Sequence, residues 1–431
     1  MLKIELPDQP FRYVTENSKL CDSETAFVLT KQNEKYLEDA RQKAHSVISI
    51  QEIGELFGIR DIKIVGITGT NGKTTTASAI YSYLLDLGYK AALQGTRGFF
   101  MNDEVVEGKS LTTPSVLHTY MHIYQAVAAG CEYFIMEVSS HAIAQERIEG
   151  LEFALKILTN ITQDHLDYHK DIEEYIRVKN SFFQDESRKL INRDEPKAKF
   201  NIKNTYTYGI ENPATYKLMA YTLNEGSSGI LQHFQEIVPF VSSLYGFFNL
   251  YNTVAAIAAV HLLTNRKLEE IAEVVPNFAG VSGRMEQVSE EPFVLVDFAH
   301  TPDGMAQVLN ALKEKDIVVV FGAGGDRDRL KRPLMGQVAA NLAKKVIITS
   351  DNPRFEDPDT IIEDILKGIE DPSGVIVEPN RREAIKKALE IREEGEIVVI
   401  LGKGDEEYQI IYDQKLPFDD REVVRELLSI S

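Results

Sequence analysis

A stretch near residue 70 carries the residue types that bind phosphate groups: residues 66–76 are Gly-Ile-Thr-Gly-Thr-Asn-Gly-Lys-Thr-Thr-Thr. Backbone N–H groups of a glycine-rich turn can surround a polyphosphate, and the positive end of a following helix attracts the anion. The apolar run at residues 62–67 predicts a buried strand before this stretch, and the apolar spacing of residues 77–87 predicts a helix after it. We therefore predict a phosphate-binding loop in which Lys73 reaches the terminal phosphates and Thr74 binds Mg²⁺.

This loop is a variant of the usual pattern. That pattern has a glycine five residues before the second one, but Ile67 occupies that position here and the glycines are Gly66, Gly69 and Gly72. The alternative interpretation is a lysine in an ordinary turn between a strand and a helix. The strand–turn–helix context favours phosphate binding.

Polar side chains that could hold a metal ion follow two further predicted strands. Glu137 lies at the end of the apolar run at residues 133–138. A carboxylate in that place suits a metal ligand in a nucleotide-binding sheet, although it could also be a solvated strand end. The predicted strand at residues 155–158 leads into residues 159–169, Thr-Asn-Ile-Thr-Gln-Asp-His-Leu-Asp-Tyr-His. Two histidines and two aspartates within six residues favour contact with a metal ion or with phosphate.

The composition indicates a soluble protein with two or three domains in its 431 residues. A formal net charge of −19 argues against a nucleic-acid partner, because the phosphates would be repelled. Cys21 and Cys131 stand in no metal-binding or redox spacing, which fits a reducing compartment. We recognise no signal peptide and expect no apolar run long enough to span a bilayer, so we expect a cytoplasmic protein.

From about residue 284 onward, predicted strands and helices alternate. That alternation indicates a mostly parallel sheet wrapped by helices. Such sheets bind ligands at the loops that follow the carboxyl ends of their strands. Three of these loops are rich in polar groups, namely residues 297–302, 322–329 and 351–354.

Two asparagines, Asn249 and Asn252, precede an apolar run at residues 253–263 that predicts a helix. Because they are three residues apart, they face one side of a helical turn. Helix capping explains one of them.

Four motifs, taken in order, resemble those of the Mur ligase family of bacterial cell-wall synthesis. They are Gly-Thr-Asn-Gly-Lys-Thr at residues 69–74, Met-Glu-Val-Ser-Ser-His at 136–141, the histidine-rich loop at 159–169, and Tyr-x-x-x-Lys at 175–179. Later motifs, among them Asp-Asn-Pro-Arg at residues 351–354, are similar to the branch of the family that adds the third peptide residue.

The resemblance implies an α/β fold with the three-domain Mur ligase architecture. Residues 1–60 would form a short UDP-sugar-binding domain, and residues 61–283 a central ATP-binding P-loop domain with a parallel sheet. Residues 284–431 would form a C-terminal Rossmann-like α/β domain that binds the amino acid. Because a first domain this small is marginally stable alone, we expect it to pack against the second.

The resemblance also implies an activity, with ATP and Mg²⁺ as cofactors. The substrates would be UDP-N-acetylmuramoyl-L-alanyl-D-glutamate and meso-diaminopimelate, joined through an acyl phosphate during peptidoglycan precursor synthesis. The enzyme would be a cytoplasmic monomer with no nucleic-acid partner.

Position by position, the family motifs imply roles for the following residues. For ATP these are Gly69, Thr70, Asn71, Gly72, Lys73, Thr74, Thr75, Asn249, Asn252, Asp297 and Lys331. For the UDP-sugar dipeptide they are Ser18, Thr112, Thr113, Ser139, Gln145 and Arg147. For diaminopimelate they are Arg327, Asn352, Arg354, Gly402 and Glu406. The metal ligands would be Thr74, Glu137, His165 and a carbamylated Lys179, although the sequence alone shows only a lysine on a helix, where lysines are usually solvated. The catalytic residues would be Lys73, Lys179, His165 and Arg284.

The chain departs from the family pattern at several of these sites. Asn17 and Lys19 differ from the uridine-nucleotide motif that Ser18 matches, and Leu111 replaces an asparagine that often precedes the two threonines. Asp405 stands where the family usually has histidine, which adds negative charge beside Glu406.

Arg354 has a physical reason to select diaminopimelate over lysine. The far end of diaminopimelate carries a carboxylate and an ammonium, whereas lysine ends in an ammonium alone. A guanidinium binds the carboxylate with two hydrogen bonds and repels a bare ammonium.

Two alternatives remain at this stage. One is another ligase of the superfamily, either a lysine-adding relative or folylpolyglutamate synthetase. The other is a nucleotide-binding switch or regulatory ATPase that makes no covalent product. Phosphate release that depends on an amino acid distinguishes a ligase from a switch.

Overall fold

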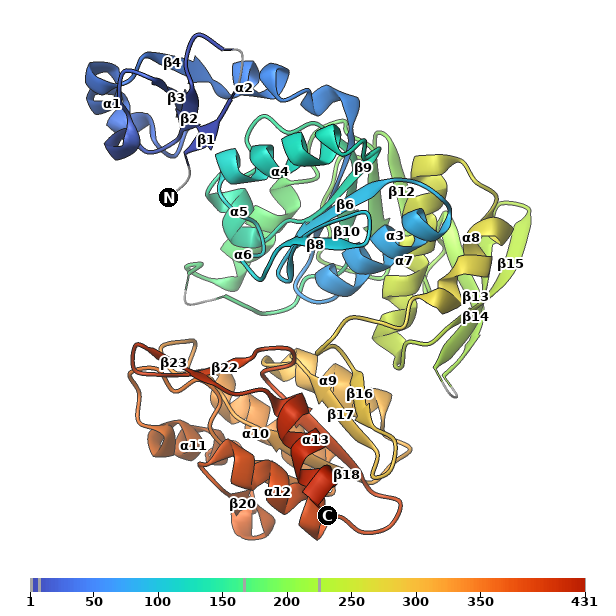
Figure 1. Cartoon of the computed structure of the whole chain (residues 1–431). Helices are drawn as coiled ribbons and strands as arrows, with labels where there is room; N and C mark the ends of the chain where they lie inside the picture. The colour runs from blue at the N-terminus through green and yellow to red at the C-terminus, as the bar shows by residue number, and fades with distance from the viewer. Residues whose placement is uncertain (1–2, 7–8, 166–167, 224–225, 431) are drawn as a thin grey trace.

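The computed structural model describes residues 3–6, 9–165, 168–223 and 226–430, and Figure 1 shows three sheets stacked along the molecule. The first sheet has four strands in the order β1-β2-β3-β4, with β2, β3 and β4 parallel. Its elements are β1 (Ile4–Glu5), β2 (Tyr13–Thr15), β3 (Thr25–Leu29), α1 (Leu37–Lys43), β4 (Ser46–Ser49) and α2 (Ile50–Leu56). Its apolar core includes Val116, Leu117 and Tyr120 of helix α4 (Val116–Ala128), which confirms that this small part packs against the next one.

The central sheet has eleven strands in the order β15-β14-β13-β12-β11-β10-β5-β9-β6-β7-β8. The seven from β13 to β6 run parallel, and antiparallel strands extend both edges. The strands are β5 (Lys63–Thr68), β6 (Ala91–Gly95), β7 (Gly98–Met101), β8 (Glu104–Glu107), β9 (Tyr133–Glu137), β10 (Phe153–Leu158), β11 (Lys189–Asn192), β12 (Thr205–Gly209), β13 (Tyr216–Thr222), β14 (Ser227–His233) and β15 (Glu236–Ser242). The helices are α3 (Lys73–Asp86), α4 (Val116–Ala128), α5 (Ser140–Ala144), α6 (Ile172–Ser181), α7 (Phe247–Thr264) and α8 (Leu268–Val274).

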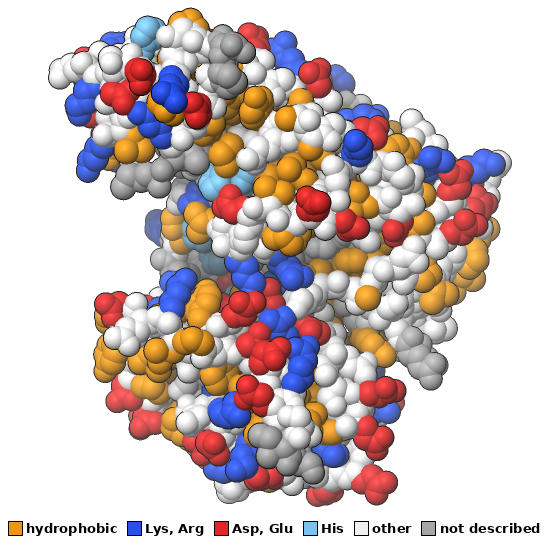
Figure 2. Space-filling model, viewed as in Figure 1, with side chains coloured by type: hydrophobic (Ala, Val, Ile, Leu, Met, Phe, Trp, Pro, Cys, Tyr) orange, Lys and Arg blue, Asp and Glu red, His pale blue; other side chains and the backbone are white. Residues whose placement is uncertain are grey.

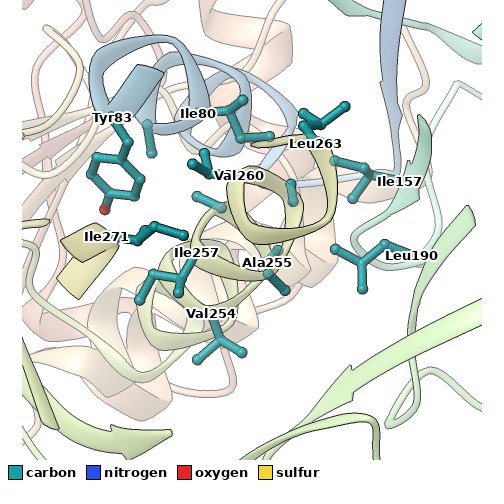
Figure 3. Packing of buried hydrophobic residues seen from close by; sticks show 14 of the residues in the cluster. Ile80, Tyr83, Ile157, Leu190, Val254, Ala255, Ile257, Val260, Leu263 and Ile271 are labelled. Carbon is teal, nitrogen blue, oxygen red and sulfur yellow. The ribbon is translucent and has the colours of Figure 1, made fainter. Parts of the chain in front are cut away.

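The largest apolar core lies between this sheet and helices α3 and α7. Figure 3 shows Ile80 and Tyr83 of α3 beside Val260 and Leu263 of α7, with Ile157 of β10 nearby. Burial of apolar side chains from one face of the central sheet and from both helices stabilises this packing. Helix α3, which begins directly after the phosphate loop, is held against the sheet by this core. The core therefore fixes the direction from which α3 meets that loop.

The third sheet has six strands in the order β16-β17-β21-β18-β19-β20, all parallel except β16. The strands are β16 (Glu286–Ser289), β17 (Val294–Asp297), β18 (Ile317–Phe321), β19 (Lys345–Ile348), β20 (Ile376–Val377) and β21 (Ile397–Leu401), and β22 (Tyr408–Ile411) and β23 (Gln414–Pro417) form a separate hairpin. The helices are α9 (Pro302–Ala311), α10 (Lys331–Leu342), α11 (Pro358–Leu366), α12 (Arg381–Ile391) and α13 (Asp420–Ile430). The predicted alternation of strands and helices from residue 284 is confirmed. Each of the three sheets lies wholly within one of the three predicted domains, residues 1–60, 61–283 and 284–431.

Two expectations about helices are wrong. Helix α3 begins at Lys73 and not at residue 77, because the threonines after the lysine form its first turn. Helix α7 begins at Phe247 with Gly246 as its N-cap, so Asn249 and Asn252 lie inside the helix and cap nothing.

Helix α7 also corrects the expectation about apolar runs. Its 18 residues have a mean hydropathy of 1.3, which is enough by length and composition to cross a membrane. However, 67% of that window is buried inside the protein, as in the core helix of a soluble domain. The helix packs against α3 in the central core.

A buried ion pair joins α12 to α13 in the third part of the chain. Arg381 donates to both carboxylate oxygens of Asp420 at 2.7 Å, and both side chains are fully buried. Arg382 and Glu426 join the same two helices at the surface, 2.7 Å apart. The two pairs therefore form a matched comparison.

We predict that Asp420→Ala lowers the free energy of unfolding by about 3–5 kcal/mol, because it leaves a guanidinium buried without its partner. Glu426→Ala should cost no more than about 1 kcal/mol, because water already surrounds that pair. Urea unfolding followed by circular dichroism measures both. Equal losses in the two variants would contradict the argument.

Candidate active site

The phosphate loop, residues 69–72, connects β5 to α3. Gly72 has a φ of +83°, and a Cβ at this position would lie 2.3 Å from Oδ1 of Asn252. The Lys73 ammonium folds back over the loop and donates to the carbonyl oxygens of Gly69 and Thr70 at 2.7 and 2.9 Å. Burial lowers the pKa of Lys73, and the nearby carboxylates of Glu137 and Asp164 oppose that shift. The loop thus presents a partly desolvated cation at the start of a helix.

Glu137 ends β9 and is only 2% exposed, so the solvated alternative is wrong. Its carboxylate accepts from the Thr74 hydroxyl at 2.8 Å and from the Thr96 backbone N–H at 2.9 Å. A hydroxyl and a carboxylate in contact beside a phosphate loop are oxygen donors of the kind that Mg²⁺ prefers.

The histidine-rich loop divides into two parts. His165 has a left-handed backbone with φ of +53°, and its Nε2 lies 3.3 Å from Oδ2 of Asp164. Burial lowers the pKa of His165 to about 4, so at neutral pH the ring is in the uncharged form that binds metals. His169 is buried, with its Nε2 3.0 Å from the Ser140 hydroxyl. The second aspartate, Asp167, lies outside the described residues.

Lys179 is 1% exposed, so it is not an ordinary solvated lysine of a helix surface. Its ammonium donates to the Gly69 carbonyl at 2.8 Å and lies 4.9 Å from the centre of the Tyr175 ring. Burial and the charge of Lys73 hold its pKa well below the usual value. The uncharged amine that this favours is the nucleophilic form that reacts with CO₂.

A cavity of about 450 Å³ lies between the central and C-terminal parts and brings most of the predicted residues together. Figure 2 shows acidic and basic side chains mixed along the junction of these two parts. The predicted residues on the central side are Thr70, Asn71, Gly72, Lys73, Thr74, Thr75, Thr112, Glu137 and His165. Those on the C-terminal side are Arg284, Arg327, Lys331, Asn352, Arg354, Gly402 and Glu406.

Asn249, Asn252 and Asp297 lie beside this cavity, in a smaller one that also reaches Gly72 and Arg284. Asn252 donates to Oδ1 of Asn249 at 2.9 Å. Asp297 accepts from the backbone N–H groups of Met285 and Ala299, both at 2.7 Å, and burial raises its pKa.

Four of the residues predicted to bind the UDP-sugar dipeptide form one network. Arg147 donates to the Thr113 carbonyl at 2.8 Å and to the Gln145 side chain at 2.9 Å. The Thr113 hydroxyl donates to the Glu137 carbonyl at 2.9 Å and accepts from the Ser139 N–H at 3.0 Å.

Thr112 lies beside that network, with its hydroxyl 3.0 Å from that of Thr96. Ser18 is not brought to these groups. It is buried in the first part of the chain and hydrogen-bonds the Asp39 side chain, whose pKa is lowered by Lys43 first and then by Ser18. Another residue of the first part, Gln32, does contact the network of Arg147, Thr113, Gln145 and Ser139. Its side chain donates to the Gln145 carbonyl at 2.5 Å.

The two arginines predicted to bind diaminopimelate flank Gly324. A Cβ at Gly324 would lie 3.0 Å from Nη1 of Arg354 and 3.7 Å from Cγ of Arg327. Arg354 is half-buried and donates to the Gly325 carbonyl at 2.7 Å. Burial lowers its pKa first, and the charge of Arg327 lowers it further. Two arginine side chains on either side of one glycine, with the charge of one acting on the other, favour an anion between them.

Sequence reasoning missed Lys403, which is fully buried. Its ammonium donates to Glu406 at 2.9 Å and to Asn352 at 3.2 Å, and Asn352 also donates to Glu406 at 2.9 Å. Its place between two glycines at a strand end was the available signal.

Asp405 bridges two parts of the chain, which sequence reasoning also missed. Its carboxylate lies 3.1 Å from the Lys109 ammonium and 3.6 Å from Nε of Arg97, and Lys109 also donates to the Asp405 carbonyl. These two cations belong to the loops after β8 and β6. The departure from histidine at this position thus creates a contact between the C-terminal and central parts.

Comparisons with known proteins agree with this arrangement. Residues 67–260 match the Mur ligase middle domain, and residues 283–404 match the Mur ligase glutamate ligase domain. A relative from Wolinella succinogenes, the UDP-N-acetylmuramoyl-L-alanyl-D-glutamate--2,6-diaminopimelate ligase, is 53% identical over 98% of both chains.

Solved structures agree as well. A structure of a ligase with that same name has a TM-score of 0.69 and 31% identity, and the match covers 99% of this chain and 97% of that one. A folylpolyglutamate synthase from Mycobacterium tuberculosis has a TM-score of 0.68 with 18% identity over 82% of this chain and 91% of that one, so it shares the fold. The chain belongs to the Mur ligase family.

Proposed function

We propose that this protein is an ATP-dependent ligase that joins meso-diaminopimelate to UDP-N-acetylmuramoyl-L-alanyl-D-glutamate for peptidoglycan synthesis. One observation carries the proposal. A single cavity has a phosphate loop with candidate metal ligands on one wall, and paired arginines with Glu406 on the other. The names of the similar ligases support the same substrates. We propose a cytoplasmic monomer.

The γ-carboxylate of D-glutamate has no good leaving group, so it must be activated before an amine can attack. Its oxygen would attack the γ-phosphorus of ATP, which forms an acyl phosphate and releases ADP. Lys73, whose ammonium folds over the phosphate loop, would stabilise the charge on the transferring phosphoryl group. Arg284, whose guanidinium stacks 4.4 Å from the Phe298 ring, would add positive charge from the opposite wall.

The donor set fits Mg²⁺. The Thr74 hydroxyl and Glu137 carboxylate are already in contact, and His165 lines the same cavity. When bound, Mg²⁺ would neutralise phosphate charge at this wall. Addition of CO₂ to the neutral Lys179 amine, with loss of one proton, would turn that buried amine into an anionic oxygen donor.

The amine of diaminopimelate would then attack the acyl phosphate carbon. A tetrahedral intermediate forms, the amine loses a proton and inorganic phosphate leaves. Arg354 and Arg327 would bind the distal carboxylate of diaminopimelate, while Glu406, held by Lys403 and Asn352, would face the ammonium beside it. The bare ammonium of lysine would meet the two guanidinium groups instead.

We predict that phosphate release from ATP with the UDP-muramoyl dipeptide requires meso-diaminopimelate and is not supported by L-lysine. Arg354→Met should lower kcat/KM for diaminopimelate by about 10- to 100-fold, because it removes a hydrogen bond between charged groups that is worth about 1.5–3 kcal/mol. Arg329→Met is the matched control, because Arg329 is exposed in the same part of the chain and pairs with Glu356. Phosphate release that requires L-lysine in place of diaminopimelate would contradict the arginine argument. Phosphate release that depends on neither amino acid would favour the regulatory ATPase.

We predict that Lys179 carries a carbamate in solutions that contain bicarbonate. Protein supplied with ¹³C-bicarbonate should show one carbamate resonance by NMR, and Lys179→Met should abolish it. Lys170→Met, at an exposed position before α6, should retain it. A resonance that survives Lys179→Met would assign the carbamate elsewhere, and its absence from the unsubstituted protein would remove Lys179 from the ligand set.

We predict that Asp405→Asn weakens the contact between the central and C-terminal parts. Loss of its ion pairs with Lys109 and Arg97, each worth roughly 0.2–1 kcal/mol, should reduce kcat/KM by about 2- to 30-fold. Small-angle scattering with an ATP analogue and both substrates should give a larger radius of gyration for this variant. Asp413→Asn, at an exposed turn, serves as control, and identical scattering and kinetics in the two variants would contradict the role of the bridge.

A further inference from the structure

Three side chains outside the cavity converge on one point. Glu107 ends β8, and His118 and His122 lie one helical turn apart on α4. Nε2 of each imidazole lies 3.0 Å from the same oxygen, Oε2 of Glu107. The three candidate ligand atoms all lie within 4.8 Å of one another.

This spacing is compatible with a metal centre. Zn²⁺ binds histidine nitrogen and glutamate oxygen at about 2.0–2.2 Å, so neighbouring ligands of a tetrahedral ion lie about 3.3 Å apart. Two histidines four residues apart on one helix are a recurrent way to supply two of the ligands. We propose that Glu107, His118 and His122 bind one divalent transition-metal ion, Zn²⁺ in particular, with water as the fourth ligand.

The surroundings of His122 prepare it for such an ion. Nδ1 of His122 lies 2.7 Å from Oε1 of the buried Gln94, whose amide nitrogen donates to the Thr119 hydroxyl at 3.3 Å. A carbonyl oxygen at Nδ1 accepts the ring proton there and leaves the lone pair on Nε2, as in metal-bound histidines. The Phe99 ring stacks on His122 with centroids 4.0 Å apart and holds its orientation.

Access and charge also suit an ion. The His122 side chain is 1% exposed, whereas that of His118 is 24% and that of Glu107 is 39% exposed. An ion could therefore reach the cluster from the side of His118 and Glu107, where water can supply the fourth ligand. One carboxylate and two imidazoles are ligands that suit a divalent transition-metal ion, and the carboxylate offsets part of its charge.

The place of the cluster in the chain gives the ion a role. Glu107 precedes the loop at residues 108–115, and His118 follows it. That loop carries Lys109, which bonds Asp405, and the predicted substrate residue Thr113. An ion bound by β8 and α4 would hold both ends of this loop and so position it.

The test measures Zn²⁺ bound to the full chain by equilibrium dialysis and elemental analysis, with Mg²⁺ in excess. We expect one Zn²⁺ per chain, and an affinity lowered more than about tenfold by Glu107→Gln and by His118→Gln. Glu104→Gln, an exposed acid on the same strand, and Glu137→Gln, in the phosphate cavity, should both retain the ion. Co²⁺ in its place should give the visible spectrum of a four-coordinate site, and both ligand variants should lose it.

Three results would overturn the proposal. They are no Zn²⁺ on the unsubstituted protein, equal binding by all variants, or loss of the ion with Glu137→Gln alone. The first would mean that the two imidazoles only hydrogen-bond the Glu107 carboxylate. Because the two substituted ligands are partly exposed, their variants should melt at the unsubstituted temperature in a chelator, and Zn²⁺ should raise the Tm only where the site is intact.

Discussion

The buried carboxylate of Glu137 fixes the relative positions of three segments that are far apart in the sequence. Its oxygens accept from Thr74, at the start of α3, and from Thr96, in the turn after β6. Its backbone carbonyl accepts from Thr113, in the loop before α4. A carboxylate this deep in the protein would be strongly destabilising without such donors. Because all three bonds end at the last residue of one central strand, the phosphate loop and the predicted substrate loop share one rigid reference point.

The same region concentrates positive charge. Lys73 and Lys179 both donate to the carbonyl oxygen of Gly69, at 2.7 and 2.8 Å. Two ammonium groups at one acceptor repel each other, and burial lowers the pKa of both. An anion between them, or conversion of one into a carbamate, relieves that repulsion. A chain with a net charge of −19 would therefore bind a polyanion through this local geometry and not through its overall charge.

Features set by local sequence could be predicted, and features set by distant contacts could not. The phosphate loop and the strand that ends at Glu137 follow from apolar runs and glycine spacing, and the structure has both. The capping interpretation of one of Asn249 and Asn252 is wrong, because the helix begins at Phe247 with Gly246 as its N-cap and both asparagines lie inside it. Lys403 and the partners of Asp405 were missed, since Asp405 meets Lys109 across 296 positions. Glu107 was missed although His118 lies only 11 positions further on, because no periodic pattern shows that β8 packs against α4.

The loop at residues 402–406 connects the proposed amino-acid wall of the cavity with a contact between the central and C-terminal parts of the chain. Lys403 is fully buried and holds Glu406 against Asn352, so the loop cannot shift at one end without moving the other. Asp405, between them, reaches Lys109 and Arg97 of the central part. An ammonium bound at Glu406 would compete with Lys403 for the same carboxylate. Occupation of the amino-acid wall would therefore alter the loop that carries Asp405, and the central part would respond through residues that touch neither substrate.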